Sequence, residues 1–327
     1  MNILFCSVGR RAELLKNFRK TMGGEGKIIA TDISKTAPAL YFSDSFYIVP
    51  PISSDNYIDE IFDICIKEKI DAITTCIDPE IMLLAKHREK FDKIGVTVLA
   101  PYKETAEICF DKFRMFEHLK KNRIATVNTY GDFESFLADY ENKNISFPVF
   151  VKPRTGSGSV GARKISSIEE LKTAFENDHG LIAQEYMGEA LDVDADVYID
   201  TVSHEPVAIF TKKKLETRIG GASKTISFID EKLVDFLRKA LKFFEFNGPI
   251  DVDLFYKDGE YYLSEINPRF GGAYLHAYGA GVDFVKLIQN NIDGKQNAQN
   301  FFSYNEDIAM LMYDSVVICN LKDTDNE

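Results

Sequence analysis

The sequence predicts an α/β protein in which a parallel, doubly wound unit is followed by a mixed, largely antiparallel sheet covered by helices. Short apolar runs alternate with amphipathic stretches through residues 1–100, a pattern typical of parallel strands joined by helices. Beyond residue 161 strand-like runs dominate, with helical patterns at 167–177, 230–245 and 282–292. A chain of 327 residues exceeds the usual size of one compact domain, so we expect two or three domains.

The N-terminal unit is predicted element by element from these runs. We expect strands at 3–8, 27–31, 45–49, 71–76 and 96–100, and helices at 11–20, 57–68 and 80–94. Gly9 stands at the first strand-to-helix turn, where backbone amides can meet an anion. No G-x-G-x-x-G follows, so a dinucleotide fingerprint is missing and a tight turn explains Gly9 equally well.

Composition narrows the class of partner. The chain carries 39 Lys and Arg against 51 Asp and Glu, a formal charge of -12, which opposes binding to nucleic acid. No apolar run reaches the roughly 20 residues of a spanning helix, and the run at 3–8 lacks the basic leader of a signal peptide. We therefore expect a cytoplasmic protein that acts on small molecules, with no nucleic-acid or membrane partner.

Several common catalytic motifs are missing. The five histidines form no H-x-x-x-H pair and do not cluster with cysteine, so zinc chemistry is not indicated. Neither a G-x-S-x-G elbow nor a G-x-x-x-x-G-K-[ST] loop is present, which disfavours a serine nucleophile and a P-loop ATPase.

A glycine-rich loop follows the middle strand of the chain. Helices expected at 105–122 and 133–142 lead to a strand at 147–153 that contains Lys152. The loop 154–161 then supplies three glycines and several hydroxyls, so its backbone amides can wrap phosphates, although an ordinary mobile hairpin has the same composition.

An acidic hairpin is predicted near the end of the chain. Side chains alternate along a strand, so Asp251 and Asp253 share one face, and on the returning strand Glu265 and Asn267 share a face. If 258–260 form a three-residue loop, Asp253 lies opposite Glu265. A two-residue loop would shift the register by one residue and place the two carboxylates on opposite faces.

These side chains predict a metal site. Carboxylates placed side by side repel each other unless a cation lies between them, and the oxygen set of Asp253, Glu265 and Asn267 is what Mg²⁺ prefers, with Mn²⁺ as a substitute. A solvated strand face would explain Asp251. It does not explain a Glu-x-Asn pair followed at once by Pro-Arg-Phe-Gly-Gly at 268–272.

The run Glu-Ile-Asn-Pro-Arg at 265–269 resembles the metal strand of the ATP-grasp superfamily, and Lys112 and Lys152 match the places of two lysines in that family. The resemblance is to carbamoyl-phosphate-synthase-like carboxylate-amine ligases. It implies that both lysines contact ATP phosphates and that the glycine-rich loop is a lid. The lid residues expected at the β- and γ-phosphates are Gly156, Ser157, Gly158 and Ser159.

The same resemblance implies a nucleotide hinge at 181–189. Adenine would meet backbone groups near Glu185 and Tyr186, and an acidic side chain would bind the ribose hydroxyls. Asp192 is favoured for that task and Glu189 competes with it. The other aspartates of 192–200 alternate with apolar residues, as expected of a strand with one solvated face.

Positive charge gathers at 212–224, which we expect to form a loop between strands. A solvated basic loop would explain it. In the ligases that the chain resembles, a comparable loop over the active site holds substrate or transferred phosphate, so Arg218 and Arg269 are candidates for stabilising an acyl phosphate.

The resemblance implies three domains: a pre-ATP-grasp domain at 1–102, an ATP-grasp small subdomain with the lid at 103–190, and a C-terminal subdomain with the metal site at 191–327. It implies an ATP-dependent ligase that uses ATP and Mg²⁺ to join a small-molecule carboxylate to an amine. A homodimer is left open. An ATP-grasp kinase acting on a hydroxyl and a non-catalytic ATP-binding regulatory module remain as alternatives.

Overall fold

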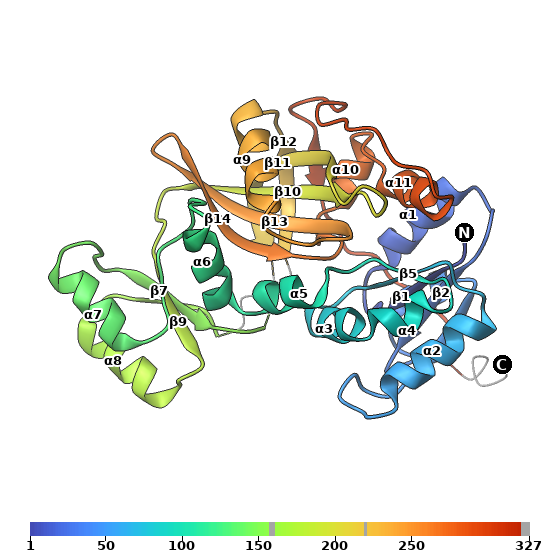
Figure 1. The fold of residues 1–327 in the computed structure, drawn as a ribbon, viewed down its shortest axis with the longest axis horizontal. Coiled ribbons are helices and arrows are strands. Elements are labelled where there is room, and N and C mark those ends of the chain that lie inside the picture. The colour runs from blue at the N-terminus through green and yellow to red at the C-terminus, as the bar shows by residue number, and fades with distance from the viewer. Residues whose placement is uncertain (157–160, 219–220, 322–327) are drawn as a thin grey trace.

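Three β-sheets organise the molecule, for which a computed structural model describes residues 1–156, 161–218 and 221–321. In Figure 1 the N-terminal sheet lies at one end, a small sheet lies at the other end, and a large sheet lies between them. The predicted order of a parallel unit followed by antiparallel sheets is confirmed. Among the described residues, no helix has both the length and the apolar character needed to cross a membrane.

The N-terminal sheet is parallel, with strand order β3-β2-β1-β4-β5. Its strands are β1 (Ile3–Cys6), β2 (Ile28–Asp32), β3 (Ser45–Ile48), β4 (Ala72–Thr75) and β5 (Thr97–Val98). Its helices are α1 (Ala12–Met22), η1 (Pro38–Phe42), α2 (Tyr57–Lys67), α3 (Asp78–Lys86) and α4 (Arg88–Asp92). The helix expected at 80–94 is thus two helices, separated at His87.

Two helices, α5 (Lys103–Phe110) and α6 (Lys112–Lys121), connect the N-terminal sheet to the rest of the chain. A single helix was predicted here, and Asp111 is the reason for the break. Its backbone is extended, and its carboxylate accepts hydrogen bonds from the amides of Phe113 and Arg114, so it caps a new helix. This cap places Lys112 at the first position of α6.

The small sheet has strand order β6-β9-β7-β8 and is antiparallel. It contains β6 (Thr129–Tyr130), α7 (Phe133–Glu141), β7 (Val149–Pro153), β8 (Arg163–Ile165), α8 (Ile168–Asn177) and β9 (Leu181–Glu185). Phe136 of α7 and Leu171 of α8 are fully buried together with Val149 and Val151 of β7. The two helices therefore cover one apolar face of this sheet.

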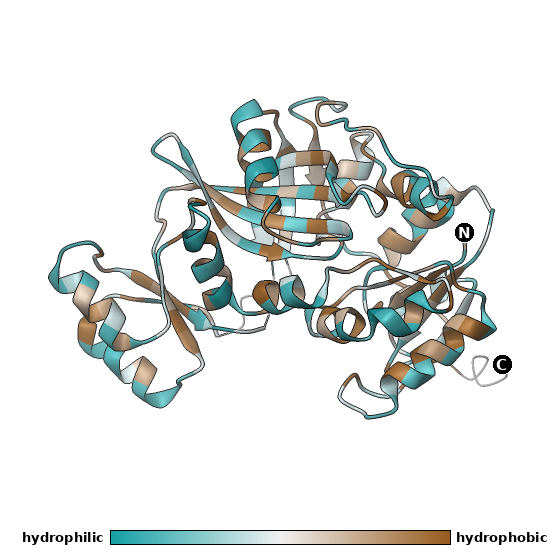
Figure 2. Cartoon of the chain, in the orientation of Figure 1, coloured by the Kyte–Doolittle hydropathy of each residue, from teal (hydrophilic) through white to brown (hydrophobic). Residues whose placement is uncertain are grey.

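The large sheet has strand order β14-β13-β10-β11-β12-β15, and every neighbouring pair is antiparallel. Its elements are β10 (Leu191–Ile199), β11 (Pro206–Arg218), β12 (Gly221–Ser227), α9 (Glu231–Leu241), β13 (Gly248–Lys257), β14 (Glu260–Asn267), α10 (Leu275–Gly279), α11 (Phe284–Ile292) and β15 (Ala309–Leu311). Figure 2 shows hydrophobic and hydrophilic residues alternating along its central strands. The apolar face, which includes Val193 and Val252, packs against Leu233 and Leu237 of α9.

The segment after β14 packs into the N-terminal part of the molecule. Phe270 contacts the ring of Phe18 on α1 at 5.6 Å between centroids, and Tyr274 and Phe284 lie in the same core. Helix α1 also contacts α10 and α11, as the ribbon shows. The end of β14 is therefore held between the large sheet and the N-terminal sheet.

Candidate functional site

One face of the large sheet is charged across four strands. Because side chains alternate, the same face carries lysines from β11, aspartates from β10 and β13, and a glutamate and an asparagine from β14. The pairing places Asp194 opposite Asp253, Asp196 opposite Asp251, Asp253 opposite Glu265 and Asp251 opposite Asn267. The members of this face are Lys212, Lys214, Asp192, Asp194, Asp196, Asp251, Asp253, Glu265 and Asn267.

The β13–β14 hairpin reaches this register in an unexpected way. Its loop has two residues, Asp258 and Gly259, both with positive φ, as a type I′ turn requires, so the three-residue loop was wrong. Lys257 pairs with Glu260 and Leu254 with Leu263, but between Asp253 and Leu254 the register shifts by one residue. A β-bulge at Ser264 therefore restores the pairing of Asp253 with Glu265 that the short loop alone would have removed.

The three predicted metal ligands lie together. Asn267 Nδ2 is 3.1 Å from Asp253 Oδ2 and 3.5 Å from Asp251 Oδ2. Rotating the amide of Asn267 by a half-turn would present its oxygen to the same place, since the two ends of an amide have the same shape. Asp253 also binds the ammonium of Lys214, which neutralises it.

Asp251 fits a cation better than the solvated role that its position in the sequence suggested. It is buried, and its Oδ1 accepts no hydrogen bond from any described residue. Burial raises the pKa of Asp251 well above its usual range, and the nearby carboxylates of Asp194 and Asp253 add to that shift. Its unpaired Oδ1 faces Asp196 Oδ1 beneath Gly271, and its Oδ2 faces Asn267. The donor set of Asp253, Glu265 and Asn267, with Oδ2 of Asp251 beside it, consists of the oxygen ligands that Mg²⁺ prefers, so the residues present fit the expected ion.

Lys112 and Lys152 come from different elements, and the charge of Glu265 acts on both. Lys112 Nζ lies 3.4 Å from Glu265 Oε1 and donates to the carbonyl of Gly156 at 2.6 Å. Burial lowers the pKa of Lys152 and the charge of Lys112 lowers it further, while Glu265 and Asp253 oppose the shift. Two lysines and two carboxylates are thus within electrostatic reach of one another, as phosphate and metal binding would require.

The glycine-rich loop begins beside these lysines. Arg154 Nε donates to both oxygens of Asp111 at 2.7 Å, and the amide of Lys112 donates to the carbonyl of Arg154, so the start of the loop is tied to the start of α6. Gly156 follows there. The other predicted lid residues, Ser157, Gly158 and Ser159, lie outside the described part of the chain.

The predicted hinge residues lie at the end of β9, at the border of the small and large sheets. Glu185 accepts a hydrogen bond from Asn128 at 3.0 Å and lies 3.4 Å from Lys257. Tyr186 is partly exposed, and Lys164 lies 4.4 Å above its ring. Both side chains are engaged by neighbours, and the backbone amide of Glu185 donates to the carbonyl of Asn128 at 2.9 Å.

The two candidates for ribose binding differ in position. Asp192 lies on the charged face, 3.1 Å from Lys214 Nζ, and burial raises the pKa of its carboxyl although Lys214 opposes the shift. Glu189 is exposed in the turn before β10. Asp192 thus shares the face that carries Asp253 and Glu265.

Arg269 is held by the start of helix α3 in the N-terminal unit. Its Nε is 2.8 Å from Asp78 Oδ1 at the start of α3, its NH1 donates to the carbonyl of Phe270 at 3.1 Å, and NH1 is 3.6 Å from Asp251 Oδ2. Burial alone would lower the pKa of Arg269, but the carboxylates of Asp78 and Asp251 hold it above its usual value. Nothing in the sequence pattern singled out Asp78.

Arg218 does not join this group. Its side chain is half exposed at the end of β11, 3.6 Å from Glu216 and 3.9 Å from Asp314. Gly221 pairs with Arg218 across the hairpin and lies close to Gly272: a Cβ on Gly221 would be 4.0 Å from the Cα of Gly272. The hairpin tip thus lies near the segment that follows Arg269, while residues 219–220 lie outside the described part.

The basic stretch and the aspartate strand both require correction. Residues 212–218 belong to β11 and 221–224 to β12, so they form a hairpin of strands in place of the expected loop. The aspartate face is buried and not solvated, because Lys212 is fully buried between Asp194, at 3.2 Å, and Asp196. The alternation of 212 and 214 in the sequence was the signal that could have indicated this pairing.

A close backbone approach covers the buried charges. A Cβ on Gly271 would lie 2.6 Å from Asp251 Oδ1 and 2.7 Å from Asp196 Oδ1, so a side chain there would collide with both carboxylates. Arg11, at the first turn of the N-terminal unit, donates to the carbonyls of Phe270 and Gly271 at 2.9 and 2.7 Å. The N-terminal unit therefore fixes the segment after β14 through both Arg11 and Asp78.

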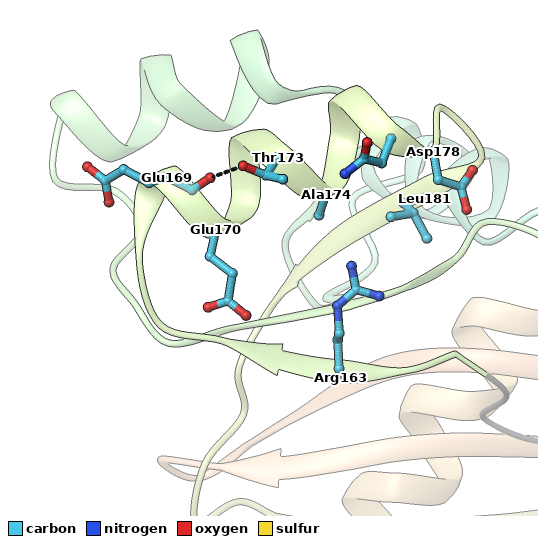
Figure 3. Close-up of a pocket in the computed structure, with 8 residues that line it drawn as sticks. Arg163, Glu169, Glu170, Thr173, Ala174, Asp178 and Leu181 are labelled. Atoms are coloured by element: carbon cyan, nitrogen blue, oxygen red, sulfur yellow. Dashed lines mark hydrogen bonds between the residues drawn. The ribbon is translucent and has the colours of Figure 1, made fainter.

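Two hollows lie near these elements. A small cavity beside the predicted metal ligands is lined by Asp78, Met82, Phe110, Gly156, Glu265 and Asn267. Figure 3 shows a second groove, between β8 and α8, in which Arg163 stands below the helix that carries Glu169 and Thr173. It holds none of the predicted site residues, whereas the first cavity is lined by three of them, Gly156, Glu265 and Asn267.

Comparisons with known proteins agree with this geometry. Residues 109–273 match the protein-family model described as "ATP-grasp domain", and residues 3–99 match the model described as "PylC-like, N-terminal domain". A D-alanine–D-alanine ligase of Francisella philomiragia is 26% identical over 250 residues, covering 67% of this chain and 82% of the ligase.

Solved structures share the fold at low identity. The biotin carboxylase domain of the 2-oxoglutarate carboxylase of Hydrogenobacter thermophilus, in complex with MgADP, ADP and bicarbonate, matches with a TM-score of 0.74 and 19% identity, covering 94% of this chain and 73% of that one. N5-carboxyaminoimidazole synthetase of Staphylococcus aureus with ADP matches with a TM-score of 0.73 and 19% identity, covering 91% and 78%.

The match to the ATP-grasp domain covers half of the chain, over the segment that holds Lys112, Lys152 and the metal strand. It confirms the expected fold and, at the level of the family, the expected use of ATP and Mg²⁺. Residues 3–99 match a PylC-like N-terminal domain, and the chain belongs to the ATP-grasp family.

Proposed function

We propose that this ATP-grasp enzyme is an ATP-dependent ligase that activates a small-molecule carboxylate as an acyl phosphate and joins it to an amine. The observation that carries the proposal is the convergence of Lys112, Lys152 and Glu265 from α6, β7 and β14. Opposite charges gathered from three distant segments suit a polyphosphate with its cation. The ligase names of the relatives support the same reaction class.

The reaction proposed has two steps. A carboxylate oxygen of the substrate bonds to the γ-phosphorus of ATP while the bond from that phosphorus to ADP breaks. The amine nitrogen then attacks the acyl carbon, the bond from carbon to the phosphate oxygen breaks, and the amine loses a proton to solvent. The products are an amide, ADP and phosphate.

Each residue has a stated task in this proposal. Mg²⁺ held by Asp253, Glu265 and Asn267, with Asp251 beside them, would neutralise charge on the phosphates. Lys112 and Lys152 bind phosphate oxygens, the lid covers them, Asp192 accepts from the ribose hydroxyls and the backbone near Glu185 and Tyr186 meets adenine. Catalysis then consists of positioning and charge stabilisation, with no protein base required.

Arg269 is proposed to hold the acyl phosphate until the amine arrives. Asp78 and the Phe270 carbonyl engage three of its five N–H donors, which leaves donors on its terminal nitrogens for a phosphate. Arg218 is proposed to assist from the hairpin tip near Gly272.

The proposal includes the organisation of the chain. We retain the domain boundaries 1–102, 103–190 and 191–327 and a cytoplasmic location. A homodimer also remains part of it, since the matched biotin carboxylase domain is described as a dimer.

Hydroxylamine trapping tests the reaction. The enzyme is incubated with ATP, Mg²⁺ and single amino acids or sugar acids, chosen by their thermal stabilisation of the protein, and hydroxylamine is added. An acyl phosphate would give a hydroxamate together with ADP and phosphate. A stable phosphorylated alcohol without hydroxamate, for every active substrate, would replace the ligase with a kinase.

A further inference from the structure

Lys214 bridges two carboxylates on the charged face of the large sheet. Its ammonium contacts Asp253 and lies 3.1 Å from Asp192 Oδ1. These aspartates lie on adjacent strands, β13 and β10, and the lysine reaches them from β11. Two carboxylates therefore share one ammonium.

The two carboxylates have different tasks in the proposed function. Asp192 is assigned to the ribose and Asp253 to the metal. The phosphate chain of a nucleotide joins its ribose to the metal-bound phosphates, so an ammonium that touches both aspartates lies along the route of that chain. Lys214 is thus placed to contact phosphate oxygens.

Lys214 and a divalent cation compete for the negative charge of Asp253. Its Oδ1 is taken by Lys214 and its Oδ2 by Asn267, so both oxygens are engaged in the structure. Asn267 needs only to turn its amide to free Oδ2 for a cation, whereas the ammonium of Lys214 repels that cation until its side chain moves away. Its four-carbon stem allows such a movement, and its side chain keeps 13% exposure at the edge of the site.

The neighbouring lysines cannot do the same. Lys212 is fully buried and enclosed by Asp194 and Asp196, so it has no open path to a ligand. Lys213 points to the other face of the sheet, where its ammonium lies 5.1 Å from the ring of Phe228. Of the three consecutive lysines, Lys214 combines contact with the site and access to it.

We propose that Lys214 is a built-in counter-ion that holds Asp253 in the nucleotide-free enzyme and transfers to the nucleotide phosphates when the nucleotide binds. The inference rests on the proposed function of the site. Lys214 then opposes binding of a divalent cation alone, and it favours binding of the cation together with nucleotide. The site would be loaded by the metal–nucleotide complex, and coupling between metal and nucleotide is reciprocal by thermodynamic necessity.

The test is a pair of binding titrations on Lys214→Met, with Lys213→Met as the matched control. Calorimetry, or the electron paramagnetic resonance signal of free Mn²⁺, measures binding of Mn²⁺ alone and of ADP in the presence of Mg²⁺. Removing the competing ammonium should tighten Mn²⁺ binding by about tenfold, while removing a phosphate contact should weaken ADP binding by about tenfold. Lys213→Met should change neither affinity.

Opposite signs are the diagnostic result, because a merely structural lysine would weaken both ligands together. If the substitution changes the Mn²⁺ and ADP affinities in the same direction, or changes neither, the inference is overturned. The nucleotide site is still upheld in that case, provided that the wild-type enzyme binds ADP with Mg²⁺. Wild-type protein that binds no ADP would instead remove the proposed function. Lys214→Arg keeps the charge and should bind both ligands with nearly wild-type affinity. It replaces Lys214→Met if that variant does not fold. Weaker ADP binding by folded Lys214→Arg, without tighter Mn²⁺ binding, would count against the counter-ion role.

Discussion

Arg269 of the metal-strand segment and Asp78 of the N-terminal unit form an ion pair at 2.8 Å, although 191 residues separate them in the chain. The ion pair fixes the guanidinium of Arg269 on the side of the site that faces the N-terminal unit. Both side chains are largely buried, so neither is free to find another partner without a cost in solvation.

Replacing Arg269 by Ala should therefore damage catalysis more than nucleotide binding. We expect a loss of about 3–4 kcal/mol of transition-state stabilisation, the size of the effect of one oxyanion donor, with little change in ADP affinity. Steady-state kinetics with the carboxylate found by the trapping screen measures it. Asp78→Asn should lower kcat in the same direction by a smaller amount, since the guanidinium remains but is no longer held. If R269A weakened ADP binding by as much as it lowered kcat, the assignment would be contradicted.

Replacing Glu265 by Gln should abolish ATP turnover while the fold persists. The amide keeps the shape of the side chain but loses the charge that balances a divalent cation and Lys112, and we expect a decrease of about 100-fold or more. Glu260→Gln is the matched control, because Glu260 lies on the same strand and pairs with Lys232 at the surface. ADP release measured for folded E265Q at near-normal rates would remove Glu265 from the metal site.

Lys212→Met should destabilise the protein strongly. The substitution leaves Asp194 and Asp196 buried without their cation, and breaking such a pair from one side costs about 3–5 kcal/mol. Urea unfolding of the variant, beside Lys213→Met on the other face, measures the difference. A change below about 1 kcal/mol, the usual size for an exposed pair, would show that this face is solvated after all.

His276 should make stability depend on pH. Its Nδ1 shares a hydrogen bond of 2.7 Å with the hydroxyl of Thr225, and its Nε2 lies 2.9 Å from the carbonyl oxygen of Ile308. Burial lowers the pKa of His276 to about 4, and the charge of Lys212 adds to the shift. A folded pKa below the unfolded value means that its contribution is fully present above about pH 6.5 and is lost as the pH falls from there towards 4.

The measurement compares wild type with His276→Gln by urea unfolding at pH 7.5 and pH 5. Wild type should lose about 2 kcal/mol more than the variant over that interval, since pH 5 lies about 1.5 units below the unfolded pKa and one unit corresponds to about 1.4 kcal/mol. Parallel pH profiles for the two proteins would show that His276 is free to become charged in the folded state.

The sequence by itself determined the parts of this site that depend on local periodicity. Glu265 and Asn267 share a face because strand side chains alternate, and Asp251 and Asp253 share a face of the preceding strand for the same reason. The run 265–269 also carried the resemblance to the family that the comparison later confirmed. None of this needed knowledge of how distant segments pack.

Tertiary structure decided the rest. The bulge at Ser264 compensates for a loop one residue shorter than expected, and a bulge arises from the pairing of two strands, which a single strand does not reveal. Asp78 reaches Arg269 only because the N-terminal sheet packs against the segment after β14, and an isolated Asp has no local pattern. Lys214 likewise meets Asp253 across an intervening strand, so its role depends on strand order and register, which pairing across the whole sheet determines.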